Sequence, residues 1–279
     1  MNPEPADLTI RSKRIHTPDG WRDGVVVVRG ETIDAIVGPG EAPAARRHVD
    51  AADDVVIPGL IDTHVHVRDP GFTDKEDWEW ATRAAAAGGV TTVIDMPNVN
   101  PIPNTVDVFR SHTANAAAKS IVDFGHNASA TIPEEIVGLA EAGATAFKIF
   151  MMTDIGRGYP HMPGAAVNNH GTLFRICEEV AKTGKTLLVH PWDQELYELM
   201  VQRAQAKWGM DHRSYARAAR QGEGIVLDSG VQTMILIQRE TGARIHMLHM
   251  MTRGMIQMVR DAQARGQAVT AEANPHPTR

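Results

Sequence analysis

The stretch Gly59-Leu-Ile-Asp-Thr-His-Val-His-Val-Arg68 decides how the rest of the chain is interpreted. Together with the apolar residues 55–57, it predicts one buried β-strand over residues 55–67. Residues i and i+2 of a strand project from the same face, so His64 and His66 are expected to point into one space. Two such imidazoles at a strand end form half of a divalent-metal site. Surface histidines are the alternative, but the apolar strand before the pair and the Arg-Asp-Pro-Gly after it favour metal binding.

Downstream of this stretch, predicted strands and helices alternate. Further strands are expected at 91–96, 121–129, 144–151, 186–191, 244–250 and 267–272. Helices are expected over 75–87, 105–119, 133–142, 173–182, 194–208, 228–240 and 255–265. This alternation predicts parallel strands joined by crossovers, which means either an α/β barrel or a doubly wound sheet.

Polar side chains at the strand ends distinguish these two folds. In a barrel, the carboxyl ends of all strands converge on one mouth, whereas an open sheet does not gather its first and sixth strands. We therefore predict a TIM-like (β/α)8 barrel over residues 57–279. The chemistry-bearing residues at or near strand ends are His64, His66, Asn98, Lys148, His190 and His249.

The first 56 residues differ from the rest. Short alternating strands and turns predict the N-terminal part of a small β-sandwich domain over residues 1–56. Its hairpins bury too little apolar surface to fold alone, so we expect it to pack on the remainder of the chain.

Composition narrows the class of protein. The chain has 279 residues, a formal net charge of −6 and no Lys/Arg-rich run, which argues against a nucleic-acid partner. No segment reaches the ~18 apolar residues that a membrane span needs, and no apolar leader is visible. The single cysteine, Cys177, suits a reducing cytoplasm. We expect a cytoplasmic protein without membrane or nucleic-acid partners.

Lys148 is the unusual member of the strand-end set because apolar residues flank it on both sides. A buried lysine without a partner is costly, so it either reaches the barrel rim or has a function. Carboxylation by CO₂ would turn its amine into a group able to bridge two metal ions. His190 ends the next strand, and the strand after that offers either His246 or His249.

With these residues in view, the chain resembles the cyclic-amide hydrolases of the amidohydrolase superfamily, namely dihydroorotases, hydantoinases (dihydropyrimidinases) and allantoinases. The resemblance covers essentially the whole chain. It rests on the motifs at 58–66, 68–71, 75–77, 87–92 and 96–98.

The resemblance implies a two-metal centre, with zinc the expected metal. His64 and His66 would bind the more buried ion, carboxylated Lys148 would bridge both, and His190 and His249 would bind the second. His249 is preferred over His246 because the His-Met-Met-Thr sequence that it begins matches the family pattern after strand six. A small cyclic amide as substrate and a homo-oligomeric state are also expected.

Two residues narrow the substrate. In dihydroorotases, residues matching Arg68 and Asn98 hold the substrate carboxylate, so reversible ring opening of dihydroorotate is the first expectation. A salt bridge from Arg68 to Asp69 or Glu76 is the alternative. Thr153 stands where hydantoinases carry tyrosine, and allantoinases generally lack the arginine. A bridging lysine is nevertheless more typical of hydantoinases and allantoinases than of many bacterial dihydroorotases.

The expected catalytic aspartate is the part of the pattern that the sequence does not contain. Relatives carry it at the end of strand eight, where it shuttles a proton. We expect that strand and its aspartate to lie beyond Arg279, so the barrel formed by residues 57–279 would be incomplete and poorly active. A non-catalytic, scaffold-like homologue is the alternative to an enzyme.

Overall fold

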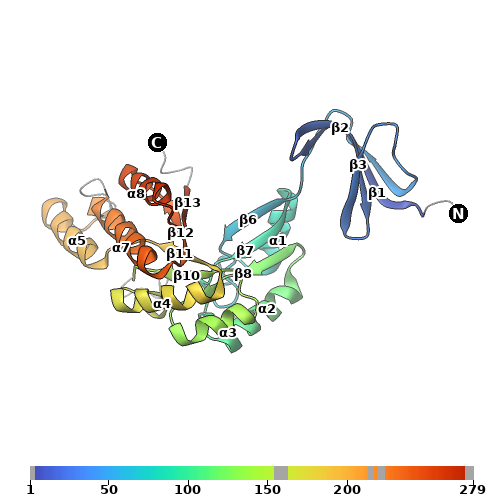
Figure 1. Ribbon diagram of the computed structural model, residues 1–279. Helices are drawn as coiled ribbons and strands as arrows, with labels where there is room; N and C mark the ends of the chain where they lie inside the picture. The colour runs from blue at the N-terminus through green and yellow to red at the C-terminus, as the bar shows by residue number, and fades with distance from the viewer. Residues whose placement is uncertain (1–3, 154–162, 213–216, 219–223, 274–279) are drawn as a thin grey trace. The chain divides into compact units, whose positions relative to one another are not determined.

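The computed structural model describes residues 4–153, 163–212, 217–218 and 224–273. It divides into two compact units, Met1–Leu60 and Ile61–Arg279 (Figure 1). Within the described ranges, no helix is long and apolar enough to cross a membrane.

The first unit is a five-stranded sheet. Its strands are β1 (Ala6–Thr17), β2 (Gly20–Arg29), β3 (Thr32–Val37), β4 (Ala45–Asp50) and β5 (Val55–Val56). The order is β3-β2-β1-β4, with β5 also pairing with β1. The strands β1, β2 and β3 are antiparallel neighbours, joined by tight turns at Gly20 and Gly30, whose φ angles are positive. The small N-terminal β-unit expected from the sequence is thus one sheet in the described residues.

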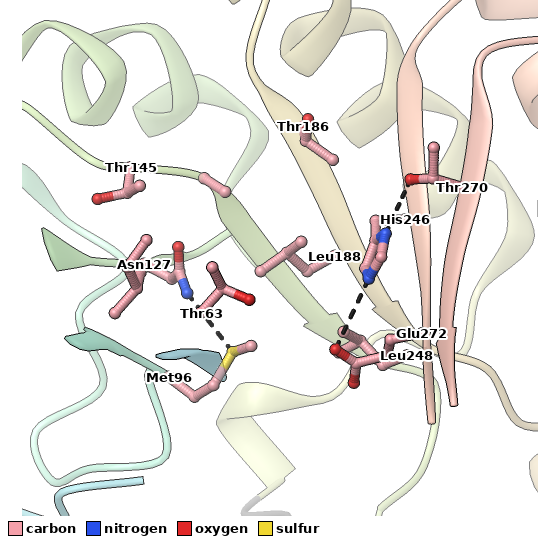
Figure 2. A pocket seen from close by; sticks show the side chains of 12 residues that line it. Thr63, Met96, Asn127, Thr145, Thr186, Leu188, His246, Leu248, Thr270 and Glu272 are labelled. Carbon is pink, nitrogen blue, oxygen red and sulfur yellow. Dashed lines mark hydrogen bonds and ion pairs between the residues drawn. The ribbon is translucent and has the colours of Figure 1, made fainter. Parts of the chain in front are cut away.

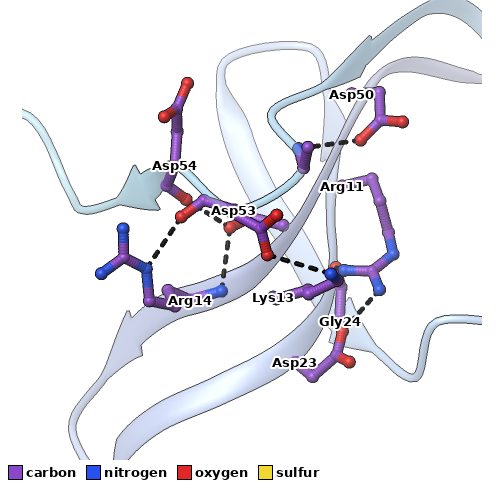
Figure 3. A network of polar contacts seen from close by, with 10 residues as sticks. Arg11, Lys13, Arg14, Asp23, Gly24, Asp50, Asp53 and Asp54 are labelled. Atoms are coloured by element: carbon purple, nitrogen blue, oxygen red, sulfur yellow. Dashed lines mark hydrogen bonds and ion pairs between the residues drawn. The ribbon is translucent and has the colours of Figure 1, made fainter.

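Ion pairs and hydrogen bonds connect β1 to β2 and to the turn before β5 (Figure 3). Arg11 on β1 lies 2.7 Å from Asp23 on β2, and Lys13 lies 2.9 Å from Asp53 in the turn before β5. The Arg14 guanidinium donates to the Asp53 carbonyl at 2.8 Å. Because these groups are partly or largely exposed, each pair contributes little stability. Their main effect is to position the neighbouring strand and turn against β1.

The second unit contains the remaining strands, which follow one another in sequence order. They are β6 (Leu60–Val65), β7 (Val90–Asp95), β8 (Asp123–His126), β9 (Ala128–Ser129), β10 (Phe147–Phe150), β11 (Thr186–His190), β12 (Arg244–Met250) and β13 (Val269–Ala273). They form the runs β6-β7-β8 and β9-β10-β11-β12-β13, and only Asn127 separates β8 from β9. The pairs from β7 onward are parallel. A sheet whose order never reverses is a barrel wall, whereas a doubly wound sheet reverses at its switch point.

Helices connect these strands and lie along one side of them (Figure 1). They are α1 (Trp78–Ala87), α2 (Val106–Lys119), α3 (Ile136–Glu141), α4 (His170–Thr183), α5 (Gln194–Trp208), α7 (Ile225–Thr241) and α8 (Arg253–Ala264). Side chains cap several of them, and the Asp77 carboxylate, which accepts from the Trp80 amide, explains why α1 begins later than predicted. Parallel strands covered by helices confirm the predicted α/β barrel class.

One prediction about the barrel is wrong. Residues 55–67 are not a single buried strand but two strands, β5 and β6, separated by Pro58 and Gly59. The side chains of Ile57, Leu60 and Ile61 are 49%, 48% and 63% exposed. Ile57 lies outside both strands, and Leu60 and Ile61 are on β6, an edge strand with β7 as its one neighbour among the described strands. The main apolar core instead lies between strands β10–β13 and helices α4 and α7.

Candidate metal centre

His64 and His66 lie side by side at the end of β6. Their ring centroids are 5.3 Å apart, as expected for alternate residues on one strand face. Burial, followed by the positive charge of Arg68, lowers the pKa of His66 to about 2. The buried Nδ1 atom of His66 has no hydrogen-bond partner among the described residues. His66 is therefore a neutral imidazole with an unused nitrogen, which is what a metal ligand must be.

Lys148 lies on β10 and is 1% exposed, so it does not reach the barrel rim. Its Nζ atom sits over the Phe150 ring, 4.5 Å from the centroid. Burial lowers the pKa of Lys148 to about 7, an effect that the charge of Glu272 opposes. A large share of this lysine is therefore the neutral amine near pH 7, and only the neutral amine can add to CO₂.

His190 and His249 form the other side of the site. His190 ends β11 and pairs in register with Phe150, while His249 lies near the end of β12. Their ring centroids are 4.5 Å apart, and His249 lies 6.2 Å from His64. Burial, and then the charge of Lys148, lowers the pKa of His249 to about 4. The two imidazole pairs thus meet across the mouth of the barrel.

A register irregularity places His249 there. The pairing of β12 with β13 shifts between Met247 and Met250, and His249 has a positive φ of 40°. Bulges of this kind re-aim a side chain, and they are common beside functional sites. The same strand directs His246 elsewhere, because its Nδ1 lies 2.8 Å from the Thr270 hydroxyl.

The gathered residues are thus four imidazoles and one lysine. In the described part of the chain, no three His, Cys, Asp or Glu side chains are close enough together to hold a metal ion. Each imidazole pair would therefore need its third ligand from Lys148, whose charge acts on both His66 and His249. The donors fit two metal ions only if the lysine is converted into an oxygen ligand.

Arg68 and Asn98, the predicted substrate residues, also come together. The Arg68 guanidinium donates to the main-chain carbonyl of Asn98 at 3.4 Å, and Asn98, in the loop after β7, is 3% exposed. The alternative partner of Arg68, the Asp69 carboxylate, makes an ion pair with Lys119 at 2.6 Å. Asn115 also donates to Asp69, at 3.0 Å. Asp69 therefore anchors the loop that follows β6.

A buried polar cluster supports the end of β6 from behind. The Asp95 carboxylate accepts from the Val67 amide at 2.8 Å, and its other oxygen lies 3.3 Å from His126 Nδ1. The His126 ring is 5.6 Å from the ring of His112 on α2. Burial, and then the nearby His126, lowers the pKa of His112 to about 4. This cluster fixes the main chain next to His66.

Glu272 is the residue of the site that sequence reasoning missed. It lies on β13, and its Oε1 atom is 2.6 Å from His64 Nδ1. The same oxygen accepts from the His249 amide at 3.2 Å. Burial would raise the pKa of Glu272, but hydrogen bonds with His246 and His64 hold it below its usual value. The available signal was an acidic side chain at the end of a predicted strand.

A cavity of 260 Å³ lies beside Glu272 (Figure 2). Threonines from several strands line it, together with His246 and Glu272. Figure 2 shows His246 between Thr270 and Glu272, with its two nitrogens facing the hydroxyl and the carboxylate.

Known proteins with similar sequences are cyclic-amide hydrolases. A family model described as dihydro-orotase-like matches residues 53–156. An allantoinase of Streptomyces avermitilis is 34% identical over 275 residues, which cover 97% of this chain and 59% of that protein. A dihydroorotase of Methanosphaera stadtmanae is 31% identical over 231 residues, which cover 81% of this chain and 49% of that protein.

A solved structure agrees with these matches. The L-hydantoinase (dihydropyrimidinase) from Arthrobacter aurescens superposes with a TM-score of 0.88 at 28% identity, over 97% of this chain and 58% of that one. The chain thus spans about half to three fifths of the length of the relatives that it matches. Sequence and fold together show that the chain belongs to the amidohydrolase superfamily, in the group of dihydroorotases, hydantoinases and allantoinases.

Proposed function

We propose that the protein hydrolyses the C–N bond of a cyclic amide at a two-metal centre. The observation that carries this proposal is the convergence of His64, His66, His190 and His249 around the buried Lys148. A buried lysine with a lowered pKa has no evident structural use at this position. It has a chemical use as the precursor of a carboxylated, metal-bridging ligand.

Two divalent ions, which we take to be Zn²⁺, would be held by these residues. His64 and His66 would bind one ion, His190 and His249 the other, and carboxylated Lys148 both. When bound, such ions supply a hydroxide near neutral pH and polarise the amide carbonyl. Carboxylation itself balances simply, because the neutral Nζ adds to the carbon of CO₂ and releases one proton. The low pKa of Lys148 supports this step.

Arg68 and Asn98 are proposed to hold a carboxylate on the substrate ring. A guanidinium offers two parallel donors that match the two oxygens of a carboxylate. The hydrogen bond from Arg68 to the main-chain carbonyl of Asn98 ties the guanidinium to the loop after β7, and the charge of Arg68 acts on His66. This arrangement favours dihydroorotate, whose ring carries such a group, and its reversible ring opening.

An uncharged ring is the second candidate. The allantoinase and the L-hydantoinase match nearly the whole chain, and they favour a hydantoin-like or allantoin-like substrate. The two candidates differ in what Arg68 does. For dihydroorotate, replacing Arg68 by Ala should lower kcat/KM by far more than for hydantoin, mainly through KM. An equal loss of kcat/KM for the two substrates would refute the role of Arg68 in binding a carboxylate and would favour an uncharged ring as the substrate.

Metal analysis and intact-mass measurement distinguish an enzyme from a scaffold-like, non-catalytic homologue. We expect two zinc ions per chain and a mass increase equal to one CO₂, with both lost in Lys148→Ala. A chain that binds no zinc and carries no adduct would support the scaffold hypothesis.

A further inference from the structure

We propose that Glu272 is a positioning residue for the metal centre. In this proposal, it fixes the tautomer and the ring direction of His64, so that His64 Nε2 presents its lone pair to a metal ion. The inference rests on the proposed function, because it presupposes that His64 binds metal.

The first argument is geometric. Glu272 on β13 contacts His64 on β6 at 2.6 Å, although 208 positions separate the two residues in the sequence. The distance is typical of a strong, charge-assisted hydrogen bond. The side chains of His64 and Glu272 are 21% and 28% exposed, so the contact is largely shielded from solvent. Such a contact restrains the imidazole ring about its χ angles.

The second argument concerns the proton on His64. An ionised carboxylate only accepts hydrogen bonds, so the His64 nitrogen that faces it must carry the hydrogen. That nitrogen is Nδ1, which leaves Nε2 with a free lone pair. Metal-binding histidines characteristically donate their second N–H to a carboxylate, which orients the ring and raises its basicity.

The third argument is that Glu272 is itself held in place. Its Oε2 atom lies 3.7 Å from His246 Nε2, and His246 Nδ1 lies 2.8 Å from the Thr270 hydroxyl (Figure 2). Its Oε1 atom also accepts from the His249 amide at 3.2 Å. The hydroxyl can donate to His246 Nδ1, so that His246 Nε2–H faces the carboxylate. Glu272 is thus fixed from two sides before any metal arrives.

His64 and His66 differ in whether their Nδ1 atom has a hydrogen-bond partner. The Nδ1 atom of His66 has no partner in the described part of the chain, while that of His64 is bound by Glu272. Removal of the carboxylate should therefore act chiefly on the ion that His64 and His66 share. The ion at His190 and His249 should be affected less, through the main-chain contact of His249 alone.

The test uses Co²⁺ titration of the metal-free protein, followed by visible absorption. We expect Glu272→Ala to lower the affinity for one of two Co²⁺ ions by about 10- to 100-fold and to change its absorption bands. Glu272→Gln should lie in between, because its amide oxygen still accepts from His64 but carries no charge. Thr186→Val is the matched control, since Thr186 lines the same cavity on β11 and should leave both affinities unchanged.

Thermal unfolding of the metal-free variants shows whether each one folds. If Glu272→Ala does not fold, Glu272→Gln decides the question. A purely structural role would lower the unfolding temperature without changing the Co²⁺ affinity or spectrum of the folded variant, and that result overturns the proposal. If the wild-type protein binds two ions and both variants bind them equally well, the role of Glu272 is refuted while the proposed function stands. If the wild-type protein binds none, both are refuted.

Discussion

Replacing Lys148 by Met should stabilise the metal-free protein while it removes the bridging ligand of the proposed metal centre. The pKa of Lys148 falls from 10.5 to about 7 because the amine is buried. The unfolded chain therefore keeps a proton up to pH 10.5 that the folded chain has half lost at pH 7. At about 1.4 kcal/mol per pH unit, this difference costs the folded state about 4 kcal/mol at pH 7. Met has a similar length and carries no charge, so it avoids this cost.

Urea unfolding with a chelator present, in CO₂-free buffer, measures the effect. The free energy of unfolding of Lys148→Met should exceed that of the wild type at pH 7 by up to about 4 kcal/mol. The sign of the pH dependence follows from the lowered pKa. The unfolded state binds more protons between pH 7 and 10.5, so the wild-type protein gains stability as the pH rises through that window. The advantage of the variant should therefore shrink toward pH 10.5.

A surface lysine provides the control for this experiment. Lys182→Met removes a side chain that is 61% exposed and paired with Glu179, and it should change stability by less than about 0.5 kcal/mol at any pH. If Lys148→Met is less stable than the wild-type protein without metal, burial does not disfavour the protonated form of Lys148 and the reasoning fails.

Contacts around the site support three more predictions. His112→Leu should reduce the loss of unfolding free energy between pH 6.5 and 4, because His112 takes up a proton near pH 6.5 in the unfolded chain but only near pH 4 in the folded chain. The difference corresponds to about 3 kcal/mol in urea unfolding measured against pH. An unchanged dependence of the unfolding free energy on pH would contradict the burial of His112. Asp69→Ala should lower the unfolding free energy by about 2 kcal/mol, less than for a fully buried pair because Lys119 can turn to solvent; a neutral effect would show that the loop after β6 needs no anchor. Gly230→Ala should lower it by about 1–3 kcal/mol, because the new methyl group would meet the main chain just after His190, and a wild-type melting curve would refute that close packing.

The sequence was most informative where its periodicity and strand ends act together. The strands of the barrel and the order of its helices agree with the alternation of patterns, because a parallel sheet needs a crossover between strands. The gathering of His64, Lys148 and His190 followed from the same rule. Residues at the carboxyl ends of parallel strands share one mouth, whatever the loops between them do.

Other features of the fold and the site depend on contacts that the periodic pattern of apolar residues does not reveal. The exposure of Ile61 arises from the edge position of β6, which a run of apolar residues cannot reveal. The direction of His249 depends on an irregularity in β12, since a regular strand would alternate its side chains strictly. Glu272 reaches His64 across a gap in the sequence too long for any local pattern.

Anomalous X-ray diffraction at the zinc edge, from crystals of the zinc-loaded protein, tests the central claim most directly. The account predicts two anomalous peaks, one beside His64 and His66 and one beside His190 and His249, with density for a carboxylate on Lys148 between them. An unmodified Lys148 side chain, or peaks located away from these imidazoles, would contradict it.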